Sequence, residues 1–292
     1  MEEPRAAEVA ENPIQHIVIF GTGPIGAGFA LTCALNKVTV ALISKSPSEL
    51  SEAREWITDF FDRGVEKGAF KAAEVYQISA KLCFALGLDH VGRADLILDC
   101  LNEDFESKRA LMAEVGPLAK PNAICATHTS LIPVRELGEA FGKPDRFIGV
   151  HFFTPVAVNK LVEVVSTPDT SRETIEEVMD FCIRIGKTPV LTKDQPGYVV
   201  NRLLVPFLLN AMKLYQEGNA PEDVDTAIEL ALGHKVGPLR LADSIGLDVV
   251  ARMAERLYEY YGDDMYDPPE VLKQHIERGR LGKKTGRGFY RY

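Results

Sequence analysis

The sequence lacks any long hydrophobic run. None of its apolar stretches reaches the roughly 18 residues that a membrane-spanning helix needs, so we expect no membrane span. The N-terminal residues, MEEPRAAEVAEN, are acidic and contain no apolar core, which argues against a secretory leader. We therefore expect residues 1–12 to be a flexible tail.

The chain has no excess of positive charge, since 42 acidic residues outnumber 33 basic ones, and its cysteines show no pattern typical of disulfide bonds. The formal net charge of −9 argues against unaided binding of nucleic acid. The five cysteines are odd in number, widely spaced and free of any C-x-x-C pair, so we expect reduced, mostly buried thiols in a cytosolic protein. Neither they nor the six histidines show a spacing typical of metal ligands, and we expect no metal site.

The pattern of the remaining residues predicts two domains, for which 292 residues suffice. Apolar strands alternate with helical stretches over 13–194, which predicts a doubly wound, mostly parallel α/β sheet. We expect helical structure over about 47–81. The turn Asp194-Gln195-Pro196-Gly197 marks a boundary, and residues 195–292 predict an all-helical domain. Its first helix, over 198–217, is apolar nearly all round and should be buried, and helical periodicity returns over 237–261.

A glycine-rich turn follows the first apolar strand. Residues 14–20 lead into Gly21-Thr22-Gly23-Pro24-Ile25-Gly26, and residues 27–35 favour a helix. Strand, G-x-G-x-x-G turn and helix together form the context of a dinucleotide-binding fingerprint. Gly21 allows the tight turn, Gly23 lets the backbone approach a pyrophosphate at the helix N-terminus, and Gly26 allows close helix packing. The alternative is a glycine turn that binds no ligand.

The second strand, over 38–43, ends without the carboxylate that commonly binds the ribose 2′-hydroxyl of NAD. Ser44-Lys45-Ser46 stands there instead. A carboxylate repels a 2′-phosphate, whereas hydroxyls and a lysine can hold one, so we hypothesise that NADP(H) is accepted, and a preference for it is the stronger form of this hypothesis. The alternative is that Lys45 only points to solvent.

Residues 146–165 predict two short buried strands, because they contain two apolar, β-branched runs joined by a proline-containing connection. His151 ends the first run and Glu163 lies in the second. If the strands fold back on each other, the carboxylate can accept one imidazole N–H and leave the other nitrogen free as a base. The alternative is a structurally satisfied histidine and a solvated glutamate.

Polar residues also follow two of the predicted parallel strands. Glu103 follows the strand over 94–101, while His128 and Ser130 follow the strand over 122–126. Residues at the carboxyl ends of parallel strands face the ligand crevice of an open α/β sheet, so we expect these three to line the site. The alternative for each is a turn or a helix cap, and Ser130 in particular could cap a helix that starts near Pro133.

These motifs, in this order, resemble the 3-hydroxyacyl-CoA dehydrogenase family over almost the whole chain. The segments that carry the resemblance are GTGPIGAGFA (21–30), ADLILDCLNED (94–104), RFIGVHFFTPVAVNKLVEVV (146–165), QPGYVVNRLL (195–204), GHKVGPLRLADSIGLD (233–248) and LGKKTGRGFY (281–290). The resemblance implies a Rossmann-like N-terminal domain, an all-helical C-terminal domain that commonly forms a homodimer, a nicotinamide cofactor (NAD or NADP) and an acyl-CoA thioester as substrate.

The resemblance also implies roles for individual residues. His151 matches the catalytic base and Glu163 the carboxylate that orients it, while Ser130 and Asn201 match polar residues of the substrate site. Two further side chains match positions near the nicotinamide end of the cofactor: Glu103 and Lys108. The implied reaction moves a hydride from the carbon that bears the 3-hydroxyl to the nicotinamide, while His151 takes the hydroxyl proton.

Three departures from the family pattern bear on specificity. Ser44 replaces the usual acidic residue, His128-Thr129-Ser130-Leu131 stands where Asn-Thr-Ser-Ser is usual, and Thr154 replaces the Asn of His-Phe-Phe-Asn-Pro. We expect His128 and Thr154 to lie in the substrate pocket and to change its shape. Two alternatives keep the chemistry but change the substrate: an acyl-carrier-protein-bound group, such as a glyceryl thioester used in making polyketide extender units, or a small free hydroxy acid such as gulonate or carnitine. A third alternative, a non-catalytic dinucleotide-binding protein of the crystallin kind, would have no need of the His151 and Glu163 pair.

Overall fold

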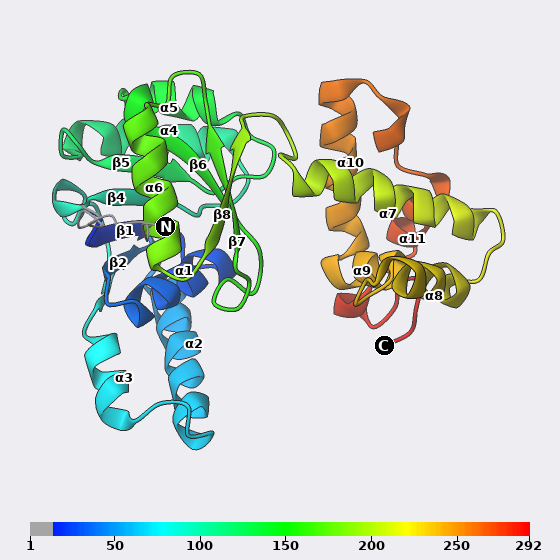
Figure 1. Cartoon of the computed structure of the whole chain (residues 1–292), viewed down its shortest axis with the longest axis horizontal. Helices are drawn as coiled ribbons and strands as arrows, with labels where there is room; N and C mark the ends of the chain where they lie inside the picture. Colours follow the sequence, from blue (N-terminus) through cyan, green and yellow to red (C-terminus); the bar gives the residue numbers. More distant parts are fainter. Residues whose placement is uncertain (1–13) are drawn as a thin grey trace, which may run out of the picture. The chain divides into compact units, whose positions relative to one another are not determined.

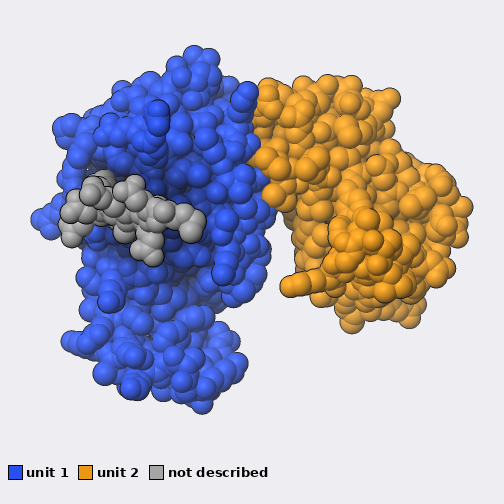
Figure 2. All heavy atoms as spheres, in the orientation of Figure 1, with its two compact units in different colours: residues 1–194 blue, residues 195–292 orange. Residues whose placement is uncertain are grey.

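The structure, a computed structural model, describes residues 14–292, so the tail expected over 1–12 lies outside the described residues. The chain divides into two compact units, one through Asp194 and one over Gln195–Tyr292, coloured blue and orange in Figure 2. Within residues 14–292, no helix is both long enough and apolar enough to cross a membrane.

The first unit is built on one eight-stranded sheet, whose strands are β1 (His16–Phe20), β2 (Thr39–Ile43), β3 (Leu82–Ala85), β4 (Leu96–Asp99), β5 (Ile124–Thr127), β6 (Phe147–Phe152), β7 (Leu161–Ser166) and β8 (Thr188–Lys193). Their order across the sheet is β3-β2-β1-β4-β5-β6-β7-β8 (Figure 1). All neighbouring strands are parallel except β6 and β7, which are antiparallel. The predicted doubly wound, mostly parallel sheet is confirmed.

The helices of this unit are α1 (Pro24–Leu35), α2 (Pro47–Glu66), α3 (Ala72–Ser79), α4 (Phe105–Val115), α5 (Val134–Phe141) and α6 (Arg172–Arg184). The main core lies where alternate strand residues such as Ile17 and Ile19 meet Phe29 of α1 and Phe181 of α6. The Phe29 and Phe181 rings meet edge to face, with centroids 6.3 Å apart. Apolar on all sides and rich in small residues, α1 is buried along most of its length.

Two segments that were expected to continue as helix are interrupted. Residues 47–81 form α2 and α3, because Gly68 adopts a left-handed φ of +71° just after α2 ends. Figure 1 shows the two helices extending away from the sheet as a pair. The strand β3, which pairs with β2, was missed because four apolar residues carry too little pattern. Residues 237–261 are divided in the same way at Gly246, where φ is +102°.

The second unit contains the helices α7 (Val200–Gln216), α8 (Pro221–Leu232), α9 (Pro238–Ile245), α10 (Leu247–Tyr261) and α11 (Glu270–Glu277). Two buried carboxylates hold it together. Asp225 accepts hydrogen bonds from backbone N–H groups at the start of α9, and Asp243 accepts them from Phe289 and Tyr290 of the C-terminal segment. Burial raises the pKa of Asp243. The glycine-rich C-terminal segment is therefore held in place by Asp243.

The first helix of this unit is less buried than its sequence predicts. It runs through Pro206 as one helix, with Leu203 70% exposed and Leu214 45% exposed. The prediction that this helix is buried on all sides is wrong for the second unit of one chain. The helices α8 to α11 contact α7 but leave one of its apolar sides open to solvent.

Candidate active site

His151 and Glu163 meet on the antiparallel pair of strands, where the register of β6 and β7 places them directly opposite each other. The imidazole Nδ1 donates a hydrogen bond to Glu163 Oε2 at 2.7 Å, because an ionised carboxylate can only accept. Both side chains are buried, with 6% and 1% of their surfaces exposed. The structure thus brings together the two residues that the sequence singled out, and it rules out the alternative of a solvated glutamate.

Ser130 lies next to the other imidazole nitrogen, with its Oγ 3.0 Å from His151 Nε2. It belongs to the loop that follows β5 at the carboxyl end of the sheet. The alternative role for Ser130, as a helix cap, is wrong. The carboxylate of Asp194 accepts hydrogen bonds from the backbone N–H groups of Val134 and Arg135 at the start of α5.

Glu103 fixes the loop that carries Ser130. Its Oε1 accepts three hydrogen bonds, from Thr129 Oγ1 at 2.6 Å and from the backbone N–H groups of Ser130 and Leu131 at 2.9 Å each. The carboxylate itself is exposed at the edge of the crevice. Glu103 therefore connects the segment after β4 to the loop after β5, at the position where the sequence predicted a site residue.

Lys108 lies beneath the two loops of the site. Its side chain is completely buried, and its three N–H groups are directed to Asp99 Oδ2 at 2.8 Å and to the carbonyl oxygens of Leu101 and His128 at 3.1 and 2.9 Å. An ammonium group has three donors, so all three are used within this network. Lys108 joins the two loops of the site, and its expected part near the nicotinamide end of the cofactor remains a prediction. The partner Asp99 was missed, although a carboxylate ending a buried apolar strand signals a need for a cation.

His128 lies beside the pair, as the sequence predicts. Its ring stacks on that of His151, with centroids 5.4 Å apart and planes 12° from parallel. Burial lowers the pKa of His128 to about 3, and the neighbouring His151 and Lys108 contribute. The ring of His128 is therefore neutral at physiological pH and adds no charge to the site. Thr154 follows β6 and is exposed.

The glycine turn has the geometry of a dinucleotide cradle. At Gly21, φ is +107°, and an added Cβ would lie 2.5 Å from the carbonyl oxygen of Cys100; at Gly26 it would lie 1.9 Å from the carbonyl oxygen of Gly21. These two glycines are required by the fold itself. At Gly23 an added Cβ would meet nothing within 4 Å, so the fold alone does not need a glycine there. Close approach of a ligand would explain it.

The N-terminus of α1 and the glycine turn line one cleft. No acidic residue lies in the first turn of α1 and no side chain caps it, so its N–H groups and positive dipole end suit a pyrophosphate. Pro24 lines the cleft, which has a volume of about 490 Å³ and is bounded by α2 and by the segment after β4. Ile25 packs against the main core instead, so its predicted role in cofactor binding is confined to the backbone. The residues present fit a dinucleotide.

The end of β2 differs from what the sequence suggested. Ser44 is 9% exposed, and its hydroxyl donates a hydrogen bond to Glu49 Oε2 at 2.5 Å. Lys45 is exposed to solvent. Glu49 was missed by the sequence analysis, although Ser46-Pro47-Ser48-Glu49 has the S-x-x-E pattern of a helix start and therefore places a glutamate near this strand end.

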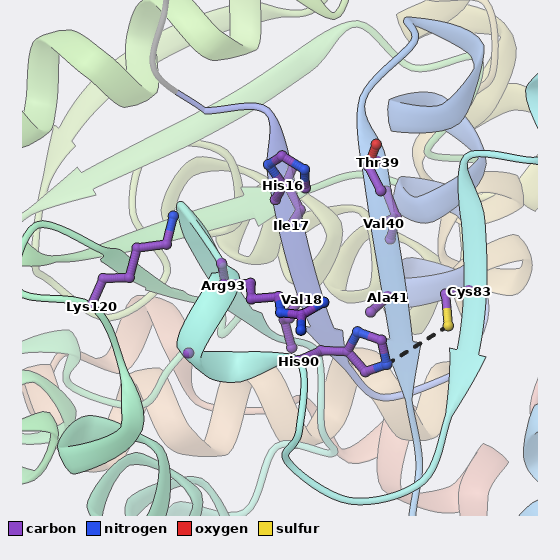
Figure 3. Close-up of a pocket in the computed structure, with 12 residues that line it drawn as sticks. His16, Ile17, Val18, Thr39, Val40, Ala41, Cys83, His90, Arg93 and Lys120 are labelled. Carbon is purple, nitrogen blue, oxygen red and sulfur yellow. Dashed lines mark hydrogen bonds between the residues drawn. The ribbon is translucent and has the colours of Figure 1, made fainter.

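A second hollow of about 490 Å³ opens on β1, β2 and β3, and it includes residues near their amino ends. Figure 3 shows His90 and the edge-strand Cys83 directed toward each other there, with Sγ and Nε2 3.8 Å apart. The hollow contains neither the glycine turn nor the pair of His151 and Glu163. Within residues 14–292, no group of three His, Cys, Asp or Glu side chains could hold a metal ion, so this hollow offers no metal site.

Asn201 belongs to the second unit, near the start of α7, and is 8% exposed. Its expected part in the substrate site remains a prediction.

Comparisons with known proteins agree with the two units. The model of the NAD-binding domain of 3-hydroxyacyl-CoA dehydrogenases matches residues 16–195, and that of their C-terminal domain matches residues 197–292. The mitochondrial hydroxyacyl-coenzyme A dehydrogenase of Mus musculus is 35% identical over 287 residues, which cover 96% of this chain and 91% of that protein.

Bacterial relatives are equally similar. The 3-hydroxybutyryl-CoA dehydrogenase of Mycobacterium tuberculosis is 36% identical over 282 residues, covering 96% of this chain and 99% of the relative. The crystal structure of the (S)-3-hydroxybutyryl-CoA dehydrogenase of Ralstonia eutropha superposes with a TM-score of 0.92 at 32% identity, covering 96% of this chain and 99% of the other. Together with the matched domains, these similarities show that the chain belongs to the 3-hydroxyacyl-CoA dehydrogenase family.

Proposed function

We propose that this protein is an NAD-dependent dehydrogenase that interconverts a 3-hydroxyacyl-CoA thioester and its 3-oxo form. The observation that supports this most directly is the buried pair of His151 and Glu163, whose second imidazole nitrogen meets Ser130 at the carboxyl end of the sheet. The glycine cradle belongs to the same sheet and opens at the same end. This is the crevice in which open α/β sheets bind their ligands.

The base in this mechanism is His151 Nε2. Glu163 holds the proton on Nδ1, so the neutral imidazole presents an unprotonated Nε2 to the substrate. That nitrogen takes the proton of the 3-hydroxyl as the C3–H bond breaks, and the positive charge that forms on the imidazole is stabilised by Glu163. Ser130 Oγ, 3.0 Å from Nε2, is placed to hydrogen-bond the reacting oxygen. The bound dinucleotide supplies the hydride acceptor.

The cofactor would be held by the glycine turn, with its pyrophosphate at the N-terminus of α1. Glu103 and the loop it fixes border the position expected for the nicotinamide end. Glu103 is therefore proposed to influence cofactor binding mainly by holding the loop of Thr129, Ser130 and Leu131 in place. The neutral, stacked ring of His128 adds no charge beside the base.

The carrier of the acyl group, the assembly state and the location are finer predictions. CoA is the carrier proposed; His128 and Thr154, which differ from the family pattern, keep the acyl-carrier-protein and free hydroxy-acid alternatives as competing hypotheses. A homodimer is proposed from the apolar side of the second unit, where Leu203 and Leu230 are 70% and 82% exposed. A cytosolic location is proposed from the free, mostly buried cysteines.

The test is an initial-rate assay with acetoacetyl-CoA and NADH. Turnover is expected, and His151→Gln should lower kcat by several orders of magnitude while NADH still binds. A mild effect of His151→Gln would mean that another group is the base. Absence of turnover in protein that binds NADH, together with turnover of a carrier-bound thioester or a free hydroxy acid, would replace the CoA assignment.

A further inference from the structure

We propose that Glu49 recognises the adenosine ribose of the dinucleotide and makes this protein prefer NAD(H) over NADP(H). The ribose would lie beside the end of β2, where the chain itself carries no acidic residue. This inference rests on the proposed function only for the identity of the ligand as a nicotinamide dinucleotide, since it concerns the end of that ligand farthest from the chemistry. It reverses the preference that Ser44 and Lys45 suggest when the sequence is considered alone.

Glu49 lies at the position where the ribose is expected. The backbone N–H of Gly21 donates to the carbonyl oxygen of Ile43 at 3.0 Å, so the glycine turn and the end of β2 are joined directly. Ser44 is the next residue along, at the place where an acidic side chain commonly holds the ribose hydroxyls. Glu49 Oε2 lies 2.5 Å from Ser44 Oγ. The first turn of α2 therefore delivers a carboxylate to the point that β2 leaves without one.

The hydroxyl of Ser44 is fully engaged by neighbouring groups of the protein. It donates its one hydrogen to Glu49 and accepts a hydrogen bond from the backbone N–H of Ser46 at 3.1 Å. A hydroxyl has a single donor, so Ser44 has none left for a 2′-phosphate. The hydroxyl instead fixes the carboxylate of Glu49 at the end of β2.

A ligand in the dinucleotide cleft can reach the carboxylate of Glu49. Glu49 lines the same cleft as Gly21, Gly23 and Pro24. Within residues 14–292, its side chain accepts a hydrogen bond from Ser44 through Oε2, so Oε1 can accept one from a ribose hydroxyl. A 2′-phosphate at the same place would bring two negative charges against a carboxylate, which disfavours NADP(H).

Glu49 also has a structural role that must be separated from this one. Its backbone N–H donates to Ser46 Oγ at the start of α2 at 3.4 Å. In a usual capping box the glutamate side chain would return to the backbone N–H of Ser46. Here that N–H is satisfied by Ser44, and the carboxylate bonds Ser44 in turn. A purely capping role predicts a change in stability with no change in cofactor preference.

The experiment measures the Kd of NADH and of NADPH on the full chain without any acyl substrate. The chain has one tryptophan, Trp56, and it lines this cleft, so quenching of its fluorescence reports binding directly. The variants are Glu49→Gln, which keeps the shape but removes the charge, and Glu52→Gln as the matched control. Glu52 lies on the same helix and lines the same cleft but is not bonded to Ser44.

The wild type should bind NADH about tenfold or more tightly than NADPH, and Glu49→Gln should reduce that ratio about tenfold, as expected for loss of a charged hydrogen bond and a repulsion. Glu52→Gln should leave the ratio within about twofold. Adding Ser44→Asp to Glu49→Gln should restore the preference for NADH, which a folding defect could not do. Preference of the wild type for NADPH, an unchanged ratio in Glu49→Gln, an equal shift in Glu52→Gln, or failure of the wild type to bind either dinucleotide would overturn the proposal. Since no acyl substrate is present, failure of the thioester assignment leaves these outcomes unaffected.

Discussion

Replacing Lys108 by Met tests how much the site depends on the buried ion pair beneath it. Lys108 and Asp99 are both completely inaccessible to solvent, and the ammonium also holds the carbonyl oxygens of Leu101 and His128. Methionine keeps the apolar stem and removes the charge. Asp99 keeps two weaker partners, the Thr127 hydroxyl and the backbone N–H of Leu101, each at 2.8 Å.

Removing one partner of a buried pair costs about 3–5 kcal/mol, because the remaining charge is left uncompensated. The two partners left to Asp99 place the expected loss for Lys108→Met near 3 kcal/mol, and adding Asp99→Asn should recover part of it. The assay is urea unfolding followed by Trp56 fluorescence, which reports the first unit alone because Trp56 is the only tryptophan.

The control is Lys120→Met. Its pair with Asp95 is just as short, at 2.6 Å, but the side chains are 32% and 20% exposed, so the expected loss is at most about 1 kcal/mol. Equal losses in the two variants, or a loss below about 1 kcal/mol for Lys108→Met, would refute the reasoning that burial makes the difference. A stable Lys108→Met with wild-type kcat would also show that the loop with Ser130 needs no support from beneath.

Three further predictions concern the base, the glycine turn and acid stability. Glu163→Gln should lower kcat by about a hundredfold or more in the initial-rate assay, since an amide does not enforce the Nδ1–H tautomer of His151; an unchanged kcat would remove Glu163 from the mechanism. Gly26→Ala should disrupt the turn, because its Cβ would lie 1.9 Å from a carbonyl oxygen, whereas Gly23→Ala should keep the urea midpoint and weaken NADH binding; wild-type affinity in Gly23→Ala would show that this glycine serves no ligand. Stability should fall as the pH drops from 6.5 toward 3, because over that range the unfolded chain binds a proton that buried His128 does not, with a slope of about 1.4 kcal/mol per pH unit for one proton. His128→Asn should flatten that slope in urea titrations at several pH values, and an identical slope would place the effect elsewhere.

Sequence reasoning placed correctly those residues whose partners lie close to them in the sequence. His151 and Glu163 are polar groups in apolar strands joined by a short connection, so their pairing follows from folding back one segment. The glycine turn likewise joins a strand and a helix that are adjacent in the sequence. The alternation of strands and helices was enough to predict the sheet, because parallel strands require crossover connections.

The contacts that sequence reasoning did not foresee join distant or irregular segments. From the sequence, Lys108 cannot be distinguished from any other lysine on a helix. Only the folded chain brings it next to Asp99 and the carbonyl oxygen of His128. From the sequence, Ser44 could bind a phosphate group. In the structure, its hydroxyl donates instead to Glu49 in the first turn of α2. The open side of α7 could not be distinguished from a buried one, because composition alone does not show which neighbours a helix will have.

The pairing of β6 with β7 has a further consequence for how activity reports the state of a preparation. Side chains on a strand alternate between faces, so a slip of one residue would move Glu163 to the opposite face from His151. A chain in that slipped register would lack the pair and would be inactive, so the specific activity of a preparation would fall with the fraction of slipped chains.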